Sequence, residues 1–178
     1  MGRSRYKIYE EDYPYFLTSS VVNWEPVFRR DSISNIILDS FEFLQSRREV
    51  TLYAYVIMED HIHFIASGND LAEKIRLFKS YTARKVIDYL KGQKEDEVLQ
   101  KFRKNTTYNV GKSEFQLWQK GFHPKQIIGD TMMVQKIDYI HKNPVEAGYI
   151  NEEEDWSYSS IHNYLDQKAP ITITCYRR

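Results

Sequence analysis

Two histidines separated by one apolar residue offer the clearest chemistry in this sequence. His61 and His63 flank Ile62 inside a run of β-branched and aromatic residues at 55–65. Side chains two positions apart in a β-strand point to the same face of the sheet. We therefore expect the two imidazoles to lie side by side and to supply two neutral nitrogen ligands to a metal ion.

A tyrosine and an asparagine four residues apart supply the groups that the histidines lack. Tyr139 and Asn143 lie in a stretch with helical apolar spacing, so a helix over 132–143 would place both side chains on one face. The amide oxygen of Asn143 suits Mg²⁺ or Mn²⁺, and a metal beside Tyr139 would assist its weakly nucleophilic phenol. We therefore predict that Asn143 completes a metal site with His61 and His63.

Each motif also has an ordinary structural explanation. An isolated His-x-His on a strand is more often a pair of sheet-surface histidines than a metal site, and a single helical tyrosine more often packs than reacts. No spacing singles out the other histidines, which are His123, His141 and His162. The functional interpretation depends on the strand motif and the helix motif occurring in one chain.

The elements that must position these residues follow from hydrophobic periodicity. Their order predicts an α+β domain with a ferredoxin-like antiparallel sheet flanked by helices. We expect strands over 14–22, 50–58 and 61–66 and one bent or bulged strand over 115–128, with β-like composition at 171–174. We expect helices over 31–47, 71–92 and 132–143, the last ended by Pro144.

Length and composition narrow the class of protein. The 178 residues suffice for one domain, over 1–178, and the charged, pattern-poor stretch 93–113 is expected to be a solvated insertion or flexible lobe. The single Cys175 excludes an internal disulfide, and no run approaches the roughly 20 apolar residues of a membrane span. Residues 1–11 do not resemble a secretory signal. We therefore expect a soluble cytoplasmic protein without a membrane partner.

The charge of the chain is balanced overall but unevenly distributed. The net charge is zero, yet residues 71–125 contain 13 basic and 6 acidic residues, a local excess of +7. A surface that follows a phosphate backbone needs such a basic block. The ordinary alternative is that these side chains solvate exposed helix faces.

Together the motifs resemble those of the single-tyrosine HUH transposases, most closely the REP-associated tyrosine transposase branch. The run at 139–148, Tyr-Ile-His-Lys-Asn-Pro-Val-Glu-Ala-Gly, is much more specific than the histidine pair. Asp60 before His61 is closer to the insertion-sequence branch of the same superfamily. The matching stretches, in the order of the family, are 60–63, 117–122, 139–148 and 156–160.

This resemblance implies a metal-dependent single-stranded DNA endonuclease and strand transferase, active as a monomer or a homodimer. Mg²⁺ or Mn²⁺ would be bound by His61 and His63, with Asn143 at the position of the third ligand. Tyr139 would attack a phosphate of single-stranded or hairpin DNA and form a 5′-phosphotyrosine link. The basic residues expected to contact DNA are Lys74, Lys79, Arg84, Lys85 and Lys120.

Two other functions fit the same residues. A domesticated protein with this fold would bind structured nucleic acid without cutting it, and its affinity would not depend on His61 or on EDTA. A two-histidine metal hydrolase would act on a small phosphoester, and replacing Tyr139 with Phe would leave its turnover unchanged.

Overall fold

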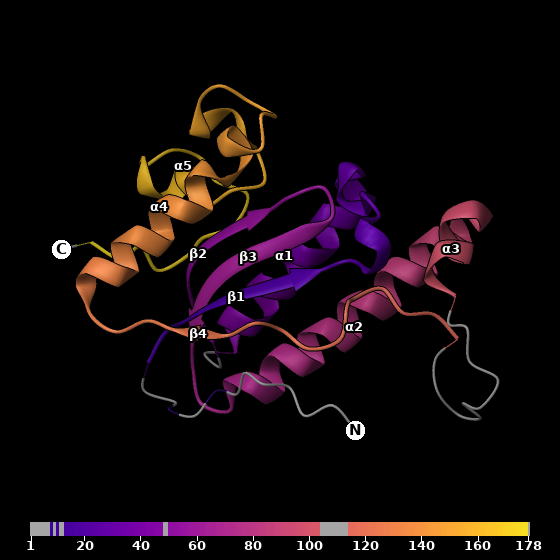
Figure 1. Cartoon of the computed structure of the whole chain (residues 1–178), viewed down its shortest axis with the longest axis horizontal. Coiled ribbons are helices and arrows are strands. Elements are labelled where there is room, and N and C mark those ends of the chain that lie inside the picture. Colours follow the sequence, from indigo (N-terminus) through magenta and orange to yellow (C-terminus); the bar gives the residue numbers. More distant parts are fainter. Residues whose placement is uncertain (1–7, 9, 11–12, 48–49, 104–113, 178) are drawn as a thin grey trace.

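The computed structural model describes residues 8, 10, 13–47, 50–103 and 114–177, and shows a four-stranded sheet with helices packed on it (Figure 1). The strands lie in the order β2-β3-β1-β4, and all neighbours are antiparallel. This arrangement confirms the predicted α+β class with a ferredoxin-like sheet. The strands are β1 (Tyr15–Ser20), β2 (Thr51–Ile57), β3 (His61–Ser67) and β4 (Lys125–Gln126).

The α-helices of the described residues divide between the two faces of the sheet. The core below α1 (Asp31–Ser46) and α2 (Leu71–Gly92) lies on one face, and α4 (Asp130–Glu146) packs on the other. Two shorter helices, α3 (Asp96–Phe102) and α5 (Ile161–Tyr164), follow α2 and α4 along the chain. None of the described helices is long and apolar enough to cross a membrane.

Alternation along β3 gives the two faces of the sheet different contents. Ile62 and Phe64 point into the larger core, below α1 and α2. His61 and His63 point to the opposite face, where Ile65 packs in the smaller core. The residues of α4 in that smaller core are Met133, Ile137 and Ile140. The predicted metal ligands therefore lie on the face that α4 covers.

The segment 156–160 joins α4 to the edge strand β2. The backbone amide of Ser160 donates to the carbonyl of Tyr55 at 2.9 Å. The hydroxyl of Ser160 accepts from the amide of Tyr55 at 2.9 Å and lies 2.9 Å from Nε2 of His141. Because His141 belongs to α4, this buried contact holds the helix at a defined position over the sheet.

The predicted end of the last long helix at Pro144 is wrong. The helix continues to Glu146, and Pro144 is buried within its last turn. The amide of Ala147 donates to the carbonyl of Asn143 at 2.9 Å, so the terminal carbonyls retain donors even though proline has no N–H. Gly148 follows with φ +76°, the left-handed conformation that often ends a helix. Asn143 thus belongs to a continuous helix that begins well before Tyr139.

The expectation of a solvated, flexible insertion over 93–113 is wrong for its first part. Residues 96–102 form α3, in which Val98, Leu99 and Phe102 are buried in the larger core. Residues 104–113 lie outside the described part of the chain. Helix α3 is short, and charged residues surround its few apolar positions, so its amphipathic pattern is difficult to recognise in the sequence.

The bent strand expected over 115–128 is also wrong. Only β4 is formed there, and Trp118 makes an isolated bridge to Val21. The indole of Trp118 instead donates to the buried hydroxyl of Thr82 in α2 at 3.0 Å. Residues 171–174 form no strand either, although the amide of Thr174 donates to a β2 carbonyl at 2.9 Å. Both segments therefore meet the sheet through isolated backbone hydrogen bonds, such as that from the amide of Gln119 to the carbonyl of Ser20 at 2.8 Å, without forming longer strands of their own.

Replacing Ser160 with Ala tests the link between α4 and β2. The variant leaves the buried amide of Tyr55 and the imidazole of His141 without this hydroxyl, so its free energy of unfolding should fall by about 1–3 kcal/mol. Urea denaturation measures the change. Ser157→Ala removes an exposed hydroxyl and should change the value by less than about 0.5 kcal/mol. Equal effects of the two substitutions would contradict the assigned role of Ser160.

Candidate active site

The two histidines of the strand motif lie side by side, as predicted. Their ring centroids are 4.8 Å apart and the ring planes meet at 74°. Nδ1 of His61 lies 2.6 Å from a carboxylate oxygen of Asp60, and Nδ1 of His63 lies 2.7 Å from the hydroxyl of Thr18. When each Nδ1–H donates to these partners, both Nε2 lone pairs are free to bind a metal.

Burial keeps His63 in the form that a metal requires. Its side chain is buried, and burial, with smaller contributions from the charges of His61 and Lys136, lowers the pKa of His63 to about 3. The imidazole is therefore neutral near neutral pH. Asp60, beside His61, provides a negative charge at the more exposed end of the pair.

Tyr139 reaches the histidine pair from α4 of the same chain. Its ring centroid lies 5.5 Å from that of His63 and 5.7 Å from that of Phe16, which stacks on His63 at 5.3 Å. The tyrosine is 38% exposed, so its phenol remains accessible to a ligand. The strand half and the helix half of the predicted site therefore meet within one chain.

Asn143 lies one helical turn after Tyr139 and is half-buried. The spacing places it on the same face of α4 as Tyr139. Among the described residues, no three His, Cys, Asp or Glu side chains are grouped so that they could hold a metal. Within that part of the chain, a third protein ligand beside His61 and His63 would have to come from a residue other than these four types. We predict that the amide oxygen of Asn143 is this ligand.

Lys136 is a member of the site that sequence reasoning missed. Its ammonium lies 4.8 Å from the ring centroid of Phe16 and 5.2 Å from that of Tyr139. Burial, and then the nearby charge of Lys125, lower the pKa of Lys136. The three-residue spacing between Lys136 and Tyr139 on one helix was the signal that could have identified it.

The two partners of the imidazoles were also missed, for different reasons. Asp60 stands next to His61 in the sequence, so its role as a carboxylate acceptor could have been proposed from the motif alone. Thr18 lies far from His63 along the chain and meets it only because the two residues are opposite each other in the β1–β3 pairing. No local pattern predicts that register.

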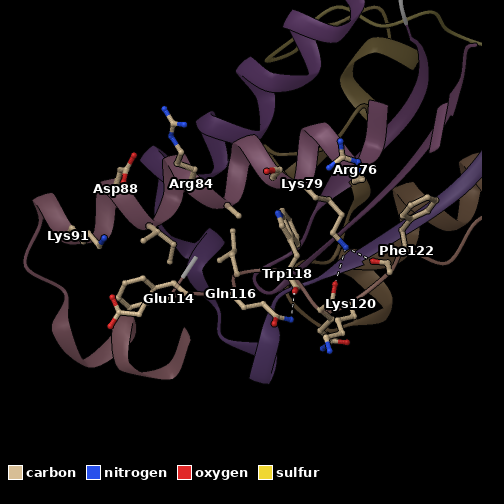
Figure 2. A pocket seen from close by; sticks show the side chains of 17 residues that line it. Arg76, Lys79, Arg84, Asp88, Lys91, Glu114, Gln116, Trp118, Lys120 and Phe122 are labelled. Atoms are coloured by element: carbon tan, nitrogen blue, oxygen red, sulfur yellow. Dashed lines mark hydrogen bonds between the residues drawn. The ribbon is translucent and has the colours of Figure 1, made fainter. Parts of the chain in front are cut away.

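The basic residues predicted to contact DNA lie on and around α2. Lys79, Arg84 and Lys120 line a cavity of about 720 Å³ between α2 and the segment 114–122. Figure 2 shows these side chains at the cavity. Lys74 and Lys85 lie on α2 outside this cavity, with the ammonium of Lys85 5.6 Å from the ring centroid of Tyr81.

The ammonium of Lys79 is engaged by two backbone carbonyls of the segment opposite α2. It donates to the carbonyl of Gln119 at 3.0 Å and to that of Gly121 (Figure 2). Burial lowers the pKa of Lys79 to about 8. Its contacts support a role in positioning the loop that carries Lys120, and they do not support direct contact with DNA.

Comparisons with known proteins identify similar chains. The profile of the family described as "Transposase IS200 like" matches residues 13–143. A curated REP-associated tyrosine transposase of Haemophilus influenzae is 33% identical over 120 residues, which span 66% of this chain and 61% of that relative. A solved structure of a REP-associated tyrosine transposase bound to a REP hairpin aligns with 100% of this chain and 98% of its own, with a TM-score of 0.65 and 17% identity. At this identity the last similarity concerns the fold alone.

The low pKa of His63 can be tested in metal-free protein. An unperturbed histidine takes up a proton near pH 6.5, whereas the His63 imidazole should remain neutral down to about pH 4. Because only the unfolded chain gains this proton, His63 makes the folded state progressively less stable as the pH falls from 6.5 toward 3. NMR titration of the His63 ring protons measures the midpoint. A midpoint near 6.5 would show that the ring is not desolvated as described.

Proposed function

Since the chain belongs to the IS200-like transposase family, we propose that it is a metal-dependent single-stranded DNA endonuclease and strand transferase whose nucleophile is Tyr139. The observation that carries this proposal is the contact between the exposed Tyr139 ring and the imidazole of His63. The His63 imidazole is buried and neutral, and the imidazole of His61 lies beside it. A phenol beside a potential metal site is the arrangement that nucleophilic attack on a phosphodiester requires.

The proposed reaction transfers a DNA phosphate to the tyrosine. The phenolic oxygen of Tyr139 forms a bond to phosphorus, and the bond between phosphorus and the 3′-oxygen breaks. The phenol loses a proton and the departing 3′-oxygen gains one. The products are a 5′-phosphotyrosine link and a free 3′-hydroxyl. One phosphoester replaces another, so strand rejoining by the reverse reaction needs no ATP.

The donor set fits a divalent ion, because two imidazole nitrogens and an amide oxygen are neutral ligands, and the amide oxygen is of the type that suits Mg²⁺ or Mn²⁺. His61, His63 and Asn143 would hold the ion. When bound, it would polarise a phosphoryl oxygen and stabilise developing negative charge. Asp60 and Thr18 would fix the orientation of the two rings, because each engages an Nδ1.

Lys136 would place a positive charge next to the attacked phosphate. Its ammonium already lies beside the Tyr139 ring, at 5.2 Å from the centroid. Lys125 stands opposite Phe16 in the β1–β4 pairing and adds a second positive charge nearby. Fixed cations around a nucleophile attract an anionic phosphate and stabilise the charge that develops in the transition state.

The proposed partner is single-stranded DNA that carries a hairpin. The structural neighbour named above is bound to a REP hairpin, and the α2 side of this chain is rich in basic residues. Lys74, Arg84, Lys85 and Lys120 would contact phosphates, whereas Lys79 would act through the 119–121 loop. Binding through phosphates should weaken steeply as salt increases.

Replacing Tyr139 with Phe tests the nucleophile. Wild-type protein incubated with hairpin-bearing single-stranded DNA and Mn²⁺ should form an adduct that resists SDS and migrates slowly in a denaturing gel. The variant lacks the phenolic oxygen and should form none. Tyr13→Phe is the matched control, because Tyr13 is also 38% exposed, and it should retain full adduct formation.

Failure of the wild-type protein to form an adduct on any repeat-derived hairpin would remove the enzymatic proposal. Hairpin binding that persists in EDTA and in His61→Ala, without any adduct, would identify the non-cleaving alternative. An adduct that survives Tyr139→Phe would assign the nucleophile to another residue.

Removing the metal tests the ligand set. EDTA should abolish the adduct, and added Mn²⁺ should restore it.

Thr18→Val keeps the shape of the side chain but removes the hydroxyl beside His63, so the affinity for Mn²⁺ should fall roughly 10- to 100-fold. Titration of adduct formation against Mn²⁺ measures the change, with Thr51→Val on β2 as a control outside the site. Full activity in EDTA would exclude a metal-dependent reaction.

A further inference from the structure

An exposed tryptophan lies at the end of the candidate site that is remote from Tyr139. Trp24 is 59% exposed, and its ring centroid lies 6.5 Å from that of His61, with the planes at 83°. His63 follows at 4.8 Å from His61, and Tyr139 at 5.5 Å from His63. Trp24 therefore ends a row of four rings that begins at the proposed nucleophile.

The backbone that carries Trp24 is strained. Asn23 and Trp24 have φ angles of 58° and 54°, in the left-handed region; asparagine adopts this region readily, whereas a bulky residue such as tryptophan rarely does. Strain of this kind persists only where surrounding contacts enforce it, and it clusters at binding and catalytic sites. Two consecutive residues in this conformation beside His61 therefore call for a functional explanation.

Contacts from two distant segments enforce this conformation. The side-chain amide of Asn23 donates to the carbonyl of Lys101 in α3 at 3.0 Å, and the ammonium of Lys101 lies 2.8 Å from the carboxylate of Glu25. On the other side, the amide of Val22 donates to the carbonyl of Leu117 at 2.8 Å. The turn is thus held from both sides while the indole stays in water, where a large apolar ring is unfavourable.

We propose that Trp24 is a stacking platform for an unpaired nucleobase of the DNA strand whose phosphate Tyr139 attacks. The inference rests on the proposed function, because it requires a DNA strand that passes His61 and Tyr139. An exposed indole stacks on any base, since every base has a π face. Bases inside a duplex stem have both faces covered, so the platform selects the unpaired part of the substrate.

The experiment measures binding without cleavage. In Tyr139→Phe protein with EDTA present, fluorescence anisotropy gives the affinity for a fluorescein-labelled oligodeoxyadenylate and for an abasic strand of the same length. Adding Trp24→Ala should weaken adenylate binding roughly 5- to 100-fold, because one stacked base is lost. Trp24→Phe retains a ring and should recover most of this affinity. The abasic strand has no faces to stack, so the parent and both variants should bind it equally.

Phe43→Ala is the matched control. Phe43 is 58% exposed, but it lies near the C-terminal end of α1, beside residues 172–174, and its removal should change neither affinity. A second measurement, of indole fluorescence, does not use Trp24→Ala and so does not depend on whether that variant folds. Adenylate should quench the indole fluorescence of the parent protein and leave that of Trp24→Phe unchanged, because Trp118 is buried and Trp156 is half-buried.

The outcomes separate this inference from the proposed function. Stacking is overturned if Trp24→Ala binds adenylate like the parent, or loses affinity for the abasic strand by the same factor. It is also overturned, with the proposed function intact, if the Tyr139 adduct forms while adenylate quenches no Trp24 fluorescence. Both the stacking inference and the proposed function are overturned if the Tyr139→Phe parent binds neither strand and the wild-type protein forms no adduct.

Discussion

Thr18 on β1 faces His63 on β3, and this pairing determines which face of the sheet carries the imidazoles. Side chains alternate along a strand, so a slip of one residue would move His61 and His63 into the apolar core below α1 and α2. The apolar residues Ile62 and Phe64 prevent that slip, because it would expose them on the α4 face. The burial of hydrophobic side chains on one face therefore stabilises the polar arrangement on the other.

Tyr139 depends on the same sheet through a different set of contacts. The smaller core positions α4 across the strands, but apolar packing alone allows a helix to slide. The hydrogen bonds of Ser160 to His141 and Tyr55 give the helix a directional link to β2, and the indole of Trp156 donates to the carbonyl of Ile57 at 2.9 Å. The same segment occupies part of the exposed edge of β2, which would otherwise be open to pairing with another chain.

The parts of the site that the sequence could predict are those that depend on local periodicity. His61 with His63 follows the two-residue repeat of a strand, and Tyr139 with Asn143 follows the four-residue neighbour rule of a helix. Thr18 could not be predicted, because its contact depends on the register between strands more than 40 residues apart. The strand predicted over 115–128 is too long for a related reason: the segment around Trp118 meets the end of β1 only through an isolated bridge and a few backbone hydrogen bonds, while its indole donates to Thr82 in α2. Pro144 predicts a helix end because proline has no N–H, but the amide of Ala147 donates to the carbonyl of Asn143 and α4 continues to Glu146.

The charged stretch that precedes the undescribed residues 104–113 shows why charge alone is a poor guide to function. Its residues looked like a solvated surface, yet Glu95 pairs with Arg30 at 3.1 Å, just before α1, and Lys101 pairs with Glu25. Both partners belong to the connection between β1 and α1. Partly exposed ion pairs of this kind add little to stability, so their main physical effect is to restrict geometry. The connection that they restrict includes Trp24, whose strained backbone would relax if the contacts were absent. Charge in this part of the chain therefore acts on the shape of the site, whereas the positive charges of Lys136 and Lys125 act on its electrostatic potential.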